Sequence, residues 1–396
     1  MVKCVQVKLV LGNPSRLVRW SLGLCGTLVL AGCSTVVPQG APVNAPPVVA
    51  PPVSSELPTD VGRHRVALLV PMTGQYASAG QSIANAANMA VLDTGGQTIR
   101  VTTYDTANGA LAALQKALRE GNQLILGPLL ADDVRAIAPA ARAAHVPVVS
   151  FSNDASVAGG GVWIMGYSPN QSIGRVVSYA HDKGVNAIAG LAASGVYGQR
   201  ASTALLHVAE SVGAQVVSMQ NYEHNPASMA GAVAKLSGGS AYEAVMIADN
   251  GKNAVMLAPL IRRASSAPVH ILGTELWSVD RTLGQSPAMQ GAWYASVPDG
   301  LFNQLASKYR VRFNKAPNRV ASLGYDSVLL ATKIADDWRN GGAFPLNKLT
   351  DKGGFSGIDG VFRFTKDGIA ERGLQVNQVT ATGVTVVSPA PTSLGN

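Results

Sequence analysis

The residues that could support acid–base, nucleophilic or metal chemistry are few and scattered. None of the six histidines lies in an HExxH motif or beside an acid at metal-ligand spacing. No G-x-S-x-G nucleophile elbow occurs, since the Ser194-Gly195 loop lacks the preceding glycine. Asp132 and Asp133 diverge on a helix because they are adjacent, so they are best interpreted as first-turn acids near unpaired N–H groups. The sequence therefore predicts a protein that is not an enzyme, with no metal and no cofactor.

The three cysteines all lie near the N-terminus, so the body of the chain is predicted to have no disulfide and no thiolate site. Arg16 and Arg19 precede a short apolar run that suits a secretory signal. The run ends in Leu-Ala-Gly-Cys33, which matches the signal of bacterial lipoproteins. Residues 1–33 are therefore predicted to be a lipoprotein signal peptide ending at a lipidated Cys33, and the alternative is a plain signal peptide with a chance cysteine. Ser34 favours anchoring at the periplasmic face of the outer membrane.

Residues 34–61 are predicted to form a linker rich in proline. Seven prolines between positions 38 and 58 exclude helix and sheet ladders. Such a tract favours an extended spacer that rises about 3.1 Å per residue where it adopts polyproline II geometry. The alternative is a slack tail, and in both cases the folded part stands away from the lipid anchor.

Charge gives little support for nucleic-acid binding. The net charge of the 396 residues is +8, of which four basic residues near the N-terminus supply half. No basic stripe with interleaved aromatic residues occurs. We therefore expect no nucleic-acid partner.

The fold is most clearly indicated by residues 123–151, which read as strand, loop, helix and strand. Leu124, Ile125 and Leu126 form a continuous apolar run, typical of a strand buried on both faces. Val134, Ile137 and Ala141 then recur at helical period, and the unit needs a parallel strand pair with a right-handed crossover. The pattern repeats on both sides, which predicts an α/β fold of two doubly wound parallel-sheet lobes. Helices are expected at 78–93, 199–211, 227–236, 252–264, 301–313 and 320–338. Three more are expected, one capped by Asn108 and ending before Gly121, one beginning at Asp132 and Asp133, and one beginning at Asn170.

Several short motifs, taken in order, resemble the type I periplasmic-binding-protein family of the branched-chain amino-acid binding type. The resemblance covers about residues 65–387 and implies two lobes joined by three crossovers, with a cleft at the carboxyl ends of the strands. It divides residues 62–387 into lobe 1, about 62–166 and 298–342, and lobe 2, about 167–297 and 343–387, followed by a loose tail at 388–396. The motifs are VALLVPMTGQYASAG, TYDTAN, ILGPL with HVPVVSFS, GYSPNQSIGR, SGVYGQRA, ILGTELW and GIDGVFRFTKDG.

The resemblance implies that a ligand carboxylate would meet residues 152–154 of lobe 1. Ser152 keeps a hydroxyl and Asn153 follows it, but Asp154 stands where the family carries a hydroxyl. Two like charges about 4 Å apart repel by roughly 4 kcal/mol at an effective dielectric constant of 20. Asp154 is therefore expected to oppose a free amino acid.

The resemblance places four further candidates in lobe 2. Asn170 replaces the acid that meets the ligand amine, and Asn250 replaces an aromatic residue. Tyr197 and Glu275 keep the family's residue types. The alternatives are a helix cap for Asn170, a packing role for Tyr197 and a solvated loop acid for Glu275.

Within the family, GPLLADDV and YDTA together with the lipobox resemble the outer-membrane lipoproteins that activate penicillin-binding proteins, the LpoA type. That branch implies a peptidoglycan synthase as partner, with the membrane contacted through the N-terminal lipid. The helical-repeat half of its best-known members is replaced here by the proline-rich tract. The alternative function is a lipid-anchored receptor of an ABC-type uptake or sensing system, whose small-molecule ligand is not a plain amino acid.

Overall fold

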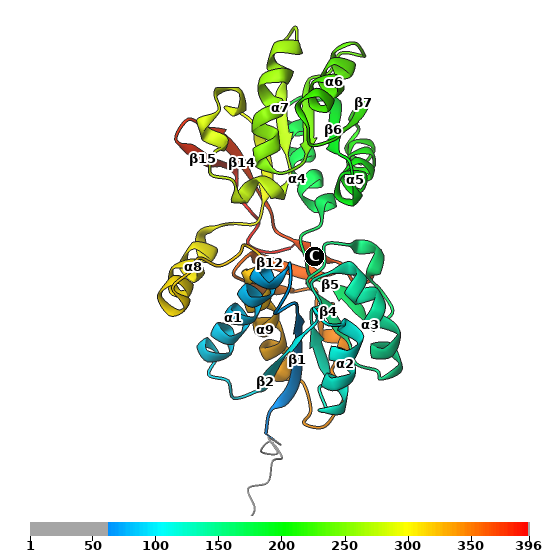
Figure 1. The fold of residues 1–396 in the computed structure, drawn as a ribbon, viewed down its shortest axis with the longest axis vertical. Coiled ribbons are helices and arrows are strands. Elements are labelled where there is room, and N and C mark those ends of the chain that lie inside the picture. The colour runs from blue at the N-terminus through cyan, green and yellow to red at the C-terminus, as the bar shows by residue number, and fades with distance from the viewer. Residues whose placement is uncertain (1–61, 395–396) are drawn as a thin grey trace, which may run out of the picture. The chain divides into compact units, whose positions relative to one another are not determined.

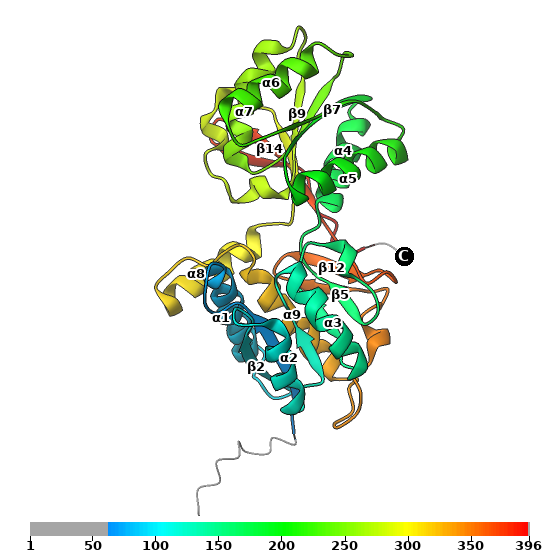
Figure 2. The same cartoon turned by 45° about the vertical axis from the view of Figure 1, so that its right-hand side comes forward.

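The computed structural model describes residues 62–394, so Cys33 and the linker lie outside the described residues. The chain forms two α/β lobes with parallel sheets, as the sequence predicts, and their helices and strands are labelled in Figures 1 and 2. Within residues 62–394, no helix combines the length and apolar character that crossing a bilayer requires.

Lobe 1 is built on a five-stranded parallel sheet in the order β2-β1-β3-β4-β5. The central strands are continuous apolar runs because helices cover both faces of the sheet, and β3 and β4 are fully buried. The strands are β1 (His64–Val70), β2 (Ile99–Asp105), β3 (Leu124–Leu126), β4 (Val148–Ser150) and β5 (Val162–Ile164).

The helices of lobe 1 form one layer on each face of this sheet (Figure 2). One layer holds α1 (Ala77–Asp93) and α9 (Ala321–Ala335), and the other holds α2 (Ala110–Arg119) and α3 (Ala131–Ala143). The helix α8 (Gly300–Phe313) joins the first layer through Tyr309, whose hydroxyl accepts a hydrogen bond from Asn85 at 2.8 Å. The cap expected at Asn108 is wrong, because Gly109 occupies the N-cap of α2 without a side-chain bond.

Residues 343–372 belong to lobe 1, which corrects their assignment to lobe 2. They form a small antiparallel sheet of β11 (Phe355–Gly357), β12 (Gly360–Phe364) and β13 (Ala370–Arg372). Phe355, Phe362 and Phe364 bury their rings in the same core as α1 and α9. Only the last two strands return to lobe 2, so the third crossover falls near Leu374 rather than 343.

Lobe 2 contains a seven-stranded sheet in the order β15-β14-β10-β9-β8-β6-β7, in which β14 and β15 run antiparallel to their neighbours. The helices α4 (Pro169–Asp182) and α5 (Val196–Val212) cover one face, and α6 (Pro226–Ser237) and α7 (Gly251–Ala264) cover the other. The strands are β6 (Ala187–Ala193), β7 (Gln215–Tyr222), β8 (Ala244–Ala248), β9 (His270–Gly273), β10 (Trp293–Ser296), β14 (Gln375–Thr380) and β15 (Gly383–Ser388).

Short 3-10 helices complete the two lobes. They are η1 (Ala155–Val157), η2 (Glu275–Val279), η3 (Leu283–Gln285), η4 (Pro287–Met289) and η5 (Leu346–Lys348).

Candidate functional site

Each residue expected in the ligand cleft lies after a strand or in the first turn of a helix. The carboxyl ends of parallel strands share one edge of each sheet, which is why these loops gather there. Their side chains nevertheless form three separate groups, each with its own partners. In chain order the seven residues are Ser152, Asn153, Asp154, Asn170, Tyr197, Asn250 and Glu275.

Asp154 is the centre of an ion-pair group that joins the two lobes. Its side chain is 1% exposed, and its Oδ2 atom lies 2.6 Å from Arg135 and 2.5 Å from Arg200. Arg135 belongs to α3 of lobe 1, whereas Arg200 belongs to α5 of lobe 2. The Oδ1 atom accepts hydrogen bonds from the backbone N–H and the hydroxyl of Ser156, at 3.0 and 2.6 Å.

The protonation of Asp154 follows from these contacts. Burial alone would raise the pKa of Asp154, but the hydrogen bonds from Ser156 and the two guanidinium groups hold it below its usual value. Two positive groups face one carboxylate, so a ligand carboxylate would not meet an uncompensated negative charge. The two guanidinium groups offset the charge of Asp154, so the repulsion estimated from the sequence is too large.

Asn153 and Asn170 face a hollow of about 400 Å³ beside this group, and Arg200 lines it as well. Both asparagines are exposed, and Asn170 is the second residue of α4. The cap alternative for Asn170 is wrong, because Ser168 occupies the N-cap position. Ser152 is 2% exposed and its hydroxyl accepts the N–H of Asp154 at 3.1 Å, so it holds the loop together.

Tyr197 and Glu275 form the second group. The Tyr197 hydroxyl lies 3.0 Å from Glu275 Oε1 and 2.9 Å from the hydroxyl of Thr274, and Ser172 donates to the other carboxyl oxygen. Burial raises the pKa of Glu275, although the hydrogen bonds from Ser172 and Tyr197 oppose that shift. Glu275 is therefore hydrogen-bonded within the lobe rather than a solvated loop acid, and the Tyr197 hydroxyl is one of its partners.

A smaller and more enclosed pocket of about 190 Å³ adjoins Glu275. Tyr167 and Arg319 line it together with the aliphatic side chains of Leu276, Val297 and Val320. The lining holds one guanidinium, that of Arg319, and one carboxyl group, that of Glu275, among mostly apolar side chains, which suits a small molecule with few polar groups.

Asn250 belongs to a third group, apart from both pockets. It caps α7 by accepting the N–H of Asn253 at 3.0 Å, and its amide donates to Asp249 at 3.0 Å. Asp249 also accepts from Tyr222 and contacts His224, at 2.7 and 2.8 Å, so its carboxylate is fully engaged within the lobe. Asn250 thus replaces a ligand-contacting side chain with a structural one.

A buried charge network that was not predicted from the sequence connects the three crossovers. Arg319 Nη1 donates to Asp359 at 2.8 Å, its guanidinium lies 3.5 Å from Asp299, and the Tyr167 hydroxyl donates to Asp359. Arg372 completes the network by donating to the carbonyl of Met165 at 2.6 Å. The first crossover, between β5 and α4, contains Tyr167. The second, between β10 and α8, contains Asp299. The third begins directly after Arg372. We call these five residues the hinge network.

In this region the pKa of Asp359 is lowered and the pKa of Asp326 is raised. Burial would raise the pKa of Asp359, but Arg319, Arg372 and the Tyr167 hydroxyl lower it below its usual value. Burial and the neighbouring charge of Asp359 raise the pKa of Asp326 to about 7. Asp326 accepts the backbone N–H of Ile358 at 2.6 Å, which fixes the loop that carries Asp359.

Because of Asp326, we expect the free energy of unfolding of the wild type to fall as the pH rises. We expect Asp326→Asn to remove this fall. The folded state retains the proton of Asp326 up to about pH 7, whereas the unfolded chain loses it near its ordinary pKa of 3.8. The folded state thus binds more protons in this window, so the contribution of Asp326 to the free energy of unfolding falls as the pH rises. Urea denaturation at several pH values between about 4 and 8 measures how the free energy of unfolding changes with pH. The variant should lack the part of this slope that comes from Asp326.

The exposed Asp367→Asn is the matched control and should follow the wild-type slope. If Asp326→Asn retained the same slope as the wild type, Asp326 would not be the protonated group.

Among residues 62–394, no three histidine, cysteine, aspartate or glutamate side chains gather as they would around a metal ion.

Comparison with known proteins agrees with the fold. A family model described as periplasmic binding protein matches residues 64–384. Among curated proteins, the chain is 25% identical over 209 residues to the uncharacterized protein RP748 of Rickettsia prowazekii, covering 50% of this chain. The match spans 56% of that relative, so the chain covers about half the length of the curated protein it resembles.

Solved structures of solute-binding proteins share the fold at low identity. A branched-chain amino acid ABC transporter ligand-binding protein from Burkholderia xenovorans is 18% identical with a TM-score of 0.65, and the match covers 84% of this chain and 95% of that one. A solute-binding protein from Rhodopseudomonas palustris, in complex with 3,4-dihydroxybenzoic acid, is 17% identical with a TM-score of 0.62, covering 83% and 99%. A substrate-binding protein from Desulfitobacterium hafniense, in complex with Leu, has the same identity and TM-score, covering 82% and 100%. The chain belongs to the periplasmic binding protein family, with the type I, branched-chain amino-acid binding-like fold.

Proposed function

We propose that this chain is a non-enzymatic envelope lipoprotein that binds and activates a penicillin-binding protein in peptidoglycan synthesis. Cys33 would carry the lipid at the periplasmic face of the outer membrane, and residues 34–61 would act as a spacer between the lipid and the lobes. Both segments lie outside the described residues, and the proposal for them rests on the lipobox and the proline-rich composition.

The observation that carries the proposal is that the charges between the lobes already have protein partners. Asp154 is neutralised by Arg135 and Arg200 and by hydrogen bonds from Ser156. Glu275 accepts hydrogen bonds from Tyr197 and Ser172, and burial raises its pKa. A free amino acid would have to displace these partners to neutralise its two ends, and doing so would leave buried charges unpaired.

A receptor fold without an open amino-acid site is compatible with a role in protein binding. The GPLLADDV and YDTA motifs support the synthase activators as the relevant branch, since the sequence resembles that branch in both places. The lipoprotein would therefore act by contacting the synthase and would catalyse no reaction itself.

The direct test uses the full-length lipoprotein purified in detergent with purified bifunctional penicillin-binding proteins. We expect co-purification and a higher rate of glycan-strand synthesis when the lipoprotein is present. Catalytically inactivated synthase serves as the control for background polymerisation. If no synthase bound and no rate changed, the activation proposal would be wrong.

A second candidate is a solute-binding receptor whose ligand is not a plain amino acid. It is favoured by the pocket of about 190 Å³, where apolar walls surround the guanidinium of Arg319. Structurally similar proteins were solved with benzoate and with 3,4-dihydroxybenzoic acid, which are small aromatic acids. A monocarboxylate of this class is the ligand that we would test first.

A thermal-shift screen separates the two candidates. A ligand present at about 100 times its Kd adds about 2.7 kcal/mol of stability, which raises the Tm measurably. A saturable rise with benzoate or a related acid would favour the receptor. We expect a flat response to aromatic acids, peptides, muropeptides and amino acids if the chain acts only by docking.

A further inference from the structure

A larger groove lies between α8 and lobe 2, lined by residues outside the three groups described above. Its volume is about 690 Å³, and α8 forms one wall. Residues 278–284 and the turn between β14 and β15 form the opposite wall. We call this hollow the α8 groove. It carries apolar side chains from both walls, namely Val279, Phe302 and Val384.

The acids that line the α8 groove already have partners. Asp280 accepts hydrogen bonds from the N–H and the hydroxyl of Thr282, at 2.8 and 2.6 Å. Asp299 lies 3.5 Å from Arg319 in the hinge network. The charge of Asp299 is therefore offset by Arg319, whereas the partners of Asp280 are uncharged.

Two arginines that line the α8 groove, Arg281 and Arg310, are exposed. Within residues 62–394, neither Arg281 nor Arg310 makes an ion pair or a side-chain hydrogen bond. One projects from each wall, so the charge that remains available in the α8 groove is positive. A planar guanidinium pairs with carboxylates through two parallel hydrogen bonds, which suits an acidic binding partner.

The surface of α8 extends this positive character beyond the α8 groove. Helix α8 contains three basic residues, Lys308, Arg310 and Arg312, and no acidic one. Val311 is 90% exposed and Leu301 is 47% exposed on the same helix, and Val279 is 62% exposed on the opposite wall. Arginines beside exposed apolar side chains are typical of protein-binding surfaces, where such residues supply much of the affinity.

We propose that the α8 groove binds an acidic segment of a partner protein that also carries apolar side chains. Its carboxylates would pair with Arg281 and Arg310, and its apolar groups would contact Val279, Phe302 and Val384. The carboxylates of Asp280 and Asp299 on the lining favour such a mixed segment over a phosphate-rich membrane surface. The chemistry of the segment follows from the groove alone. Its assignment to a penicillin-binding protein rests on the function proposed above.

The test uses the full-length chain in detergent and a fluorescein-labelled peptide of glutamates interrupted by leucines. We expect a saturable rise in anisotropy, with a Kd on the order of 10 to 100 µM, that weakens as salt rises from about 50 to 200 mM. The double variant Arg281→Glu and Arg310→Glu should weaken binding at least about tenfold. An all-glutamate peptide should bind more weakly, because it lacks the apolar contacts.

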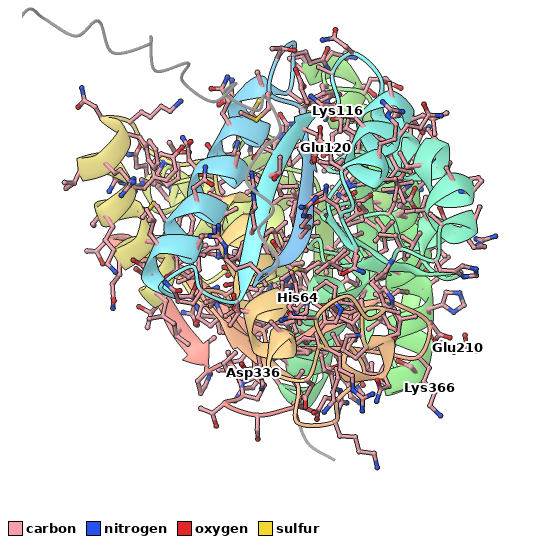
Figure 3. The ribbon with its side chains drawn as sticks, turned by 90° about the horizontal axis from the view of Figure 1, so that it is seen from below. His64, Lys116, Glu120, Glu210, Asp336 and Lys366 are labelled. Carbon is pink, nitrogen blue, oxygen red and sulfur yellow. The ribbon has the colours of Figure 1, made fainter. Side chains whose placement is uncertain are left out.

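The control is the double variant Lys116→Glu and Lys366→Glu, which changes the net charge equally. Both lysines are exposed on lobe 1, and Figure 3 shows them apart from α8, the yellow helix at its left edge. Binding within about twofold of the wild type is expected for this control. Equal losses in the two double variants, or no binding by the wild type, would overturn the proposal. Stronger binding to phosphatidylglycerol nanodiscs than to the peptide, lost in the groove variant, would overturn it in favour of a membrane surface.

A second readout separates this inference from the proposed function. If the groove variant still bound and activated the synthase, the groove would not be the synthase-docking site, although the synthase proposal would stand. If the wild type bound the acidic peptide at the groove but no synthase, the proposed function would fail and the groove chemistry would stand.

Discussion

Replacing Asp359 with alanine is expected to lower the free energy of unfolding by about 3 to 5 kcal/mol, because breaking a buried ion pair leaves an uncompensated charge. Asp359 is fully buried, and its carboxylate faces Arg319 at 2.8 Å. Arg319 is only 11% exposed in its side chain, so water cannot replace the lost partner. Arg372 would lose the same counter-charge, since it lies 5% exposed in the same network.

Guanidinium denaturation of the wild type and Asp359→Ala measures this loss. The exposed Asp367→Ala is the control and should change stability by less than about 0.5 kcal/mol. Adding Arg319→Met to Asp359→Ala should restore part of the loss, because the buried charge is then removed as well. A loss below about 1 kcal/mol for Asp359→Ala would show that the hinge network contributes little to stability.

Asp154→Ala is expected to cost about 2 to 3 kcal/mol, since several charged and polar donors lose one buried acceptor. Arg135 and Arg200 contact the same oxygen, at 2.6 and 2.5 Å, so the variant leaves two guanidinium groups close together without the carboxylate. The pair between Asp154 and Arg200 also joins the lobes, so its loss should loosen one lobe relative to the other. Unfolding measurements together with the distance between probes on the two lobes test both effects.

Two further variants make this second prediction specific. Arg200→Ala should cost less than Asp154→Ala, because Arg135 and Ser156 still neutralise the carboxylate. Asp132 is 94% exposed and pairs with the same Arg135, so Asp132→Ala is the control and should change little. A double-mutant cycle for Asp154 and Arg200 should give a coupling energy of about 0.5 kcal/mol or more. A cycle without measurable coupling would contradict the role of this pair as a link between the lobes.

The regular elements were predictable because their patterns are local. The apolar run of Leu124 to Leu126 and the helical spacing of Val134, Ile137 and Ala141 each identify one element from neighbouring residues. Which sheet an element joins is not local information. The rings of Phe355 and Phe362 pack with α1 and α9 from far away in sequence, so the assignment of residues 343–372 failed.

The candidate site could be predicted only in part for a similar physical reason. The resemblance implies cleft positions for Asp154 and Glu275, and in the structure they follow the strands β4 and β9. Their charge states depend on Arg135, Arg200 and Tyr197, which belong to other elements and resemble ordinary surface or packing residues in sequence. The spacing from Asp154 to Arg200 carries no periodic signal, so the interlobe pair could be found only from the structure.

The central claim is that the charges between the lobes are satisfied by the protein itself, so they do not hold a free amino acid. Isothermal titration of the full-length chain with leucine and isoleucine, to about 5 mM, tests it most directly. Even a complex with a Kd near 1 mM, worth about 4 kcal/mol, would show curvature over that range. We expect only heats of dilution. A saturable isotherm with a micromolar Kd, weakened by Tyr197→Phe and Glu275→Gln, would contradict the account.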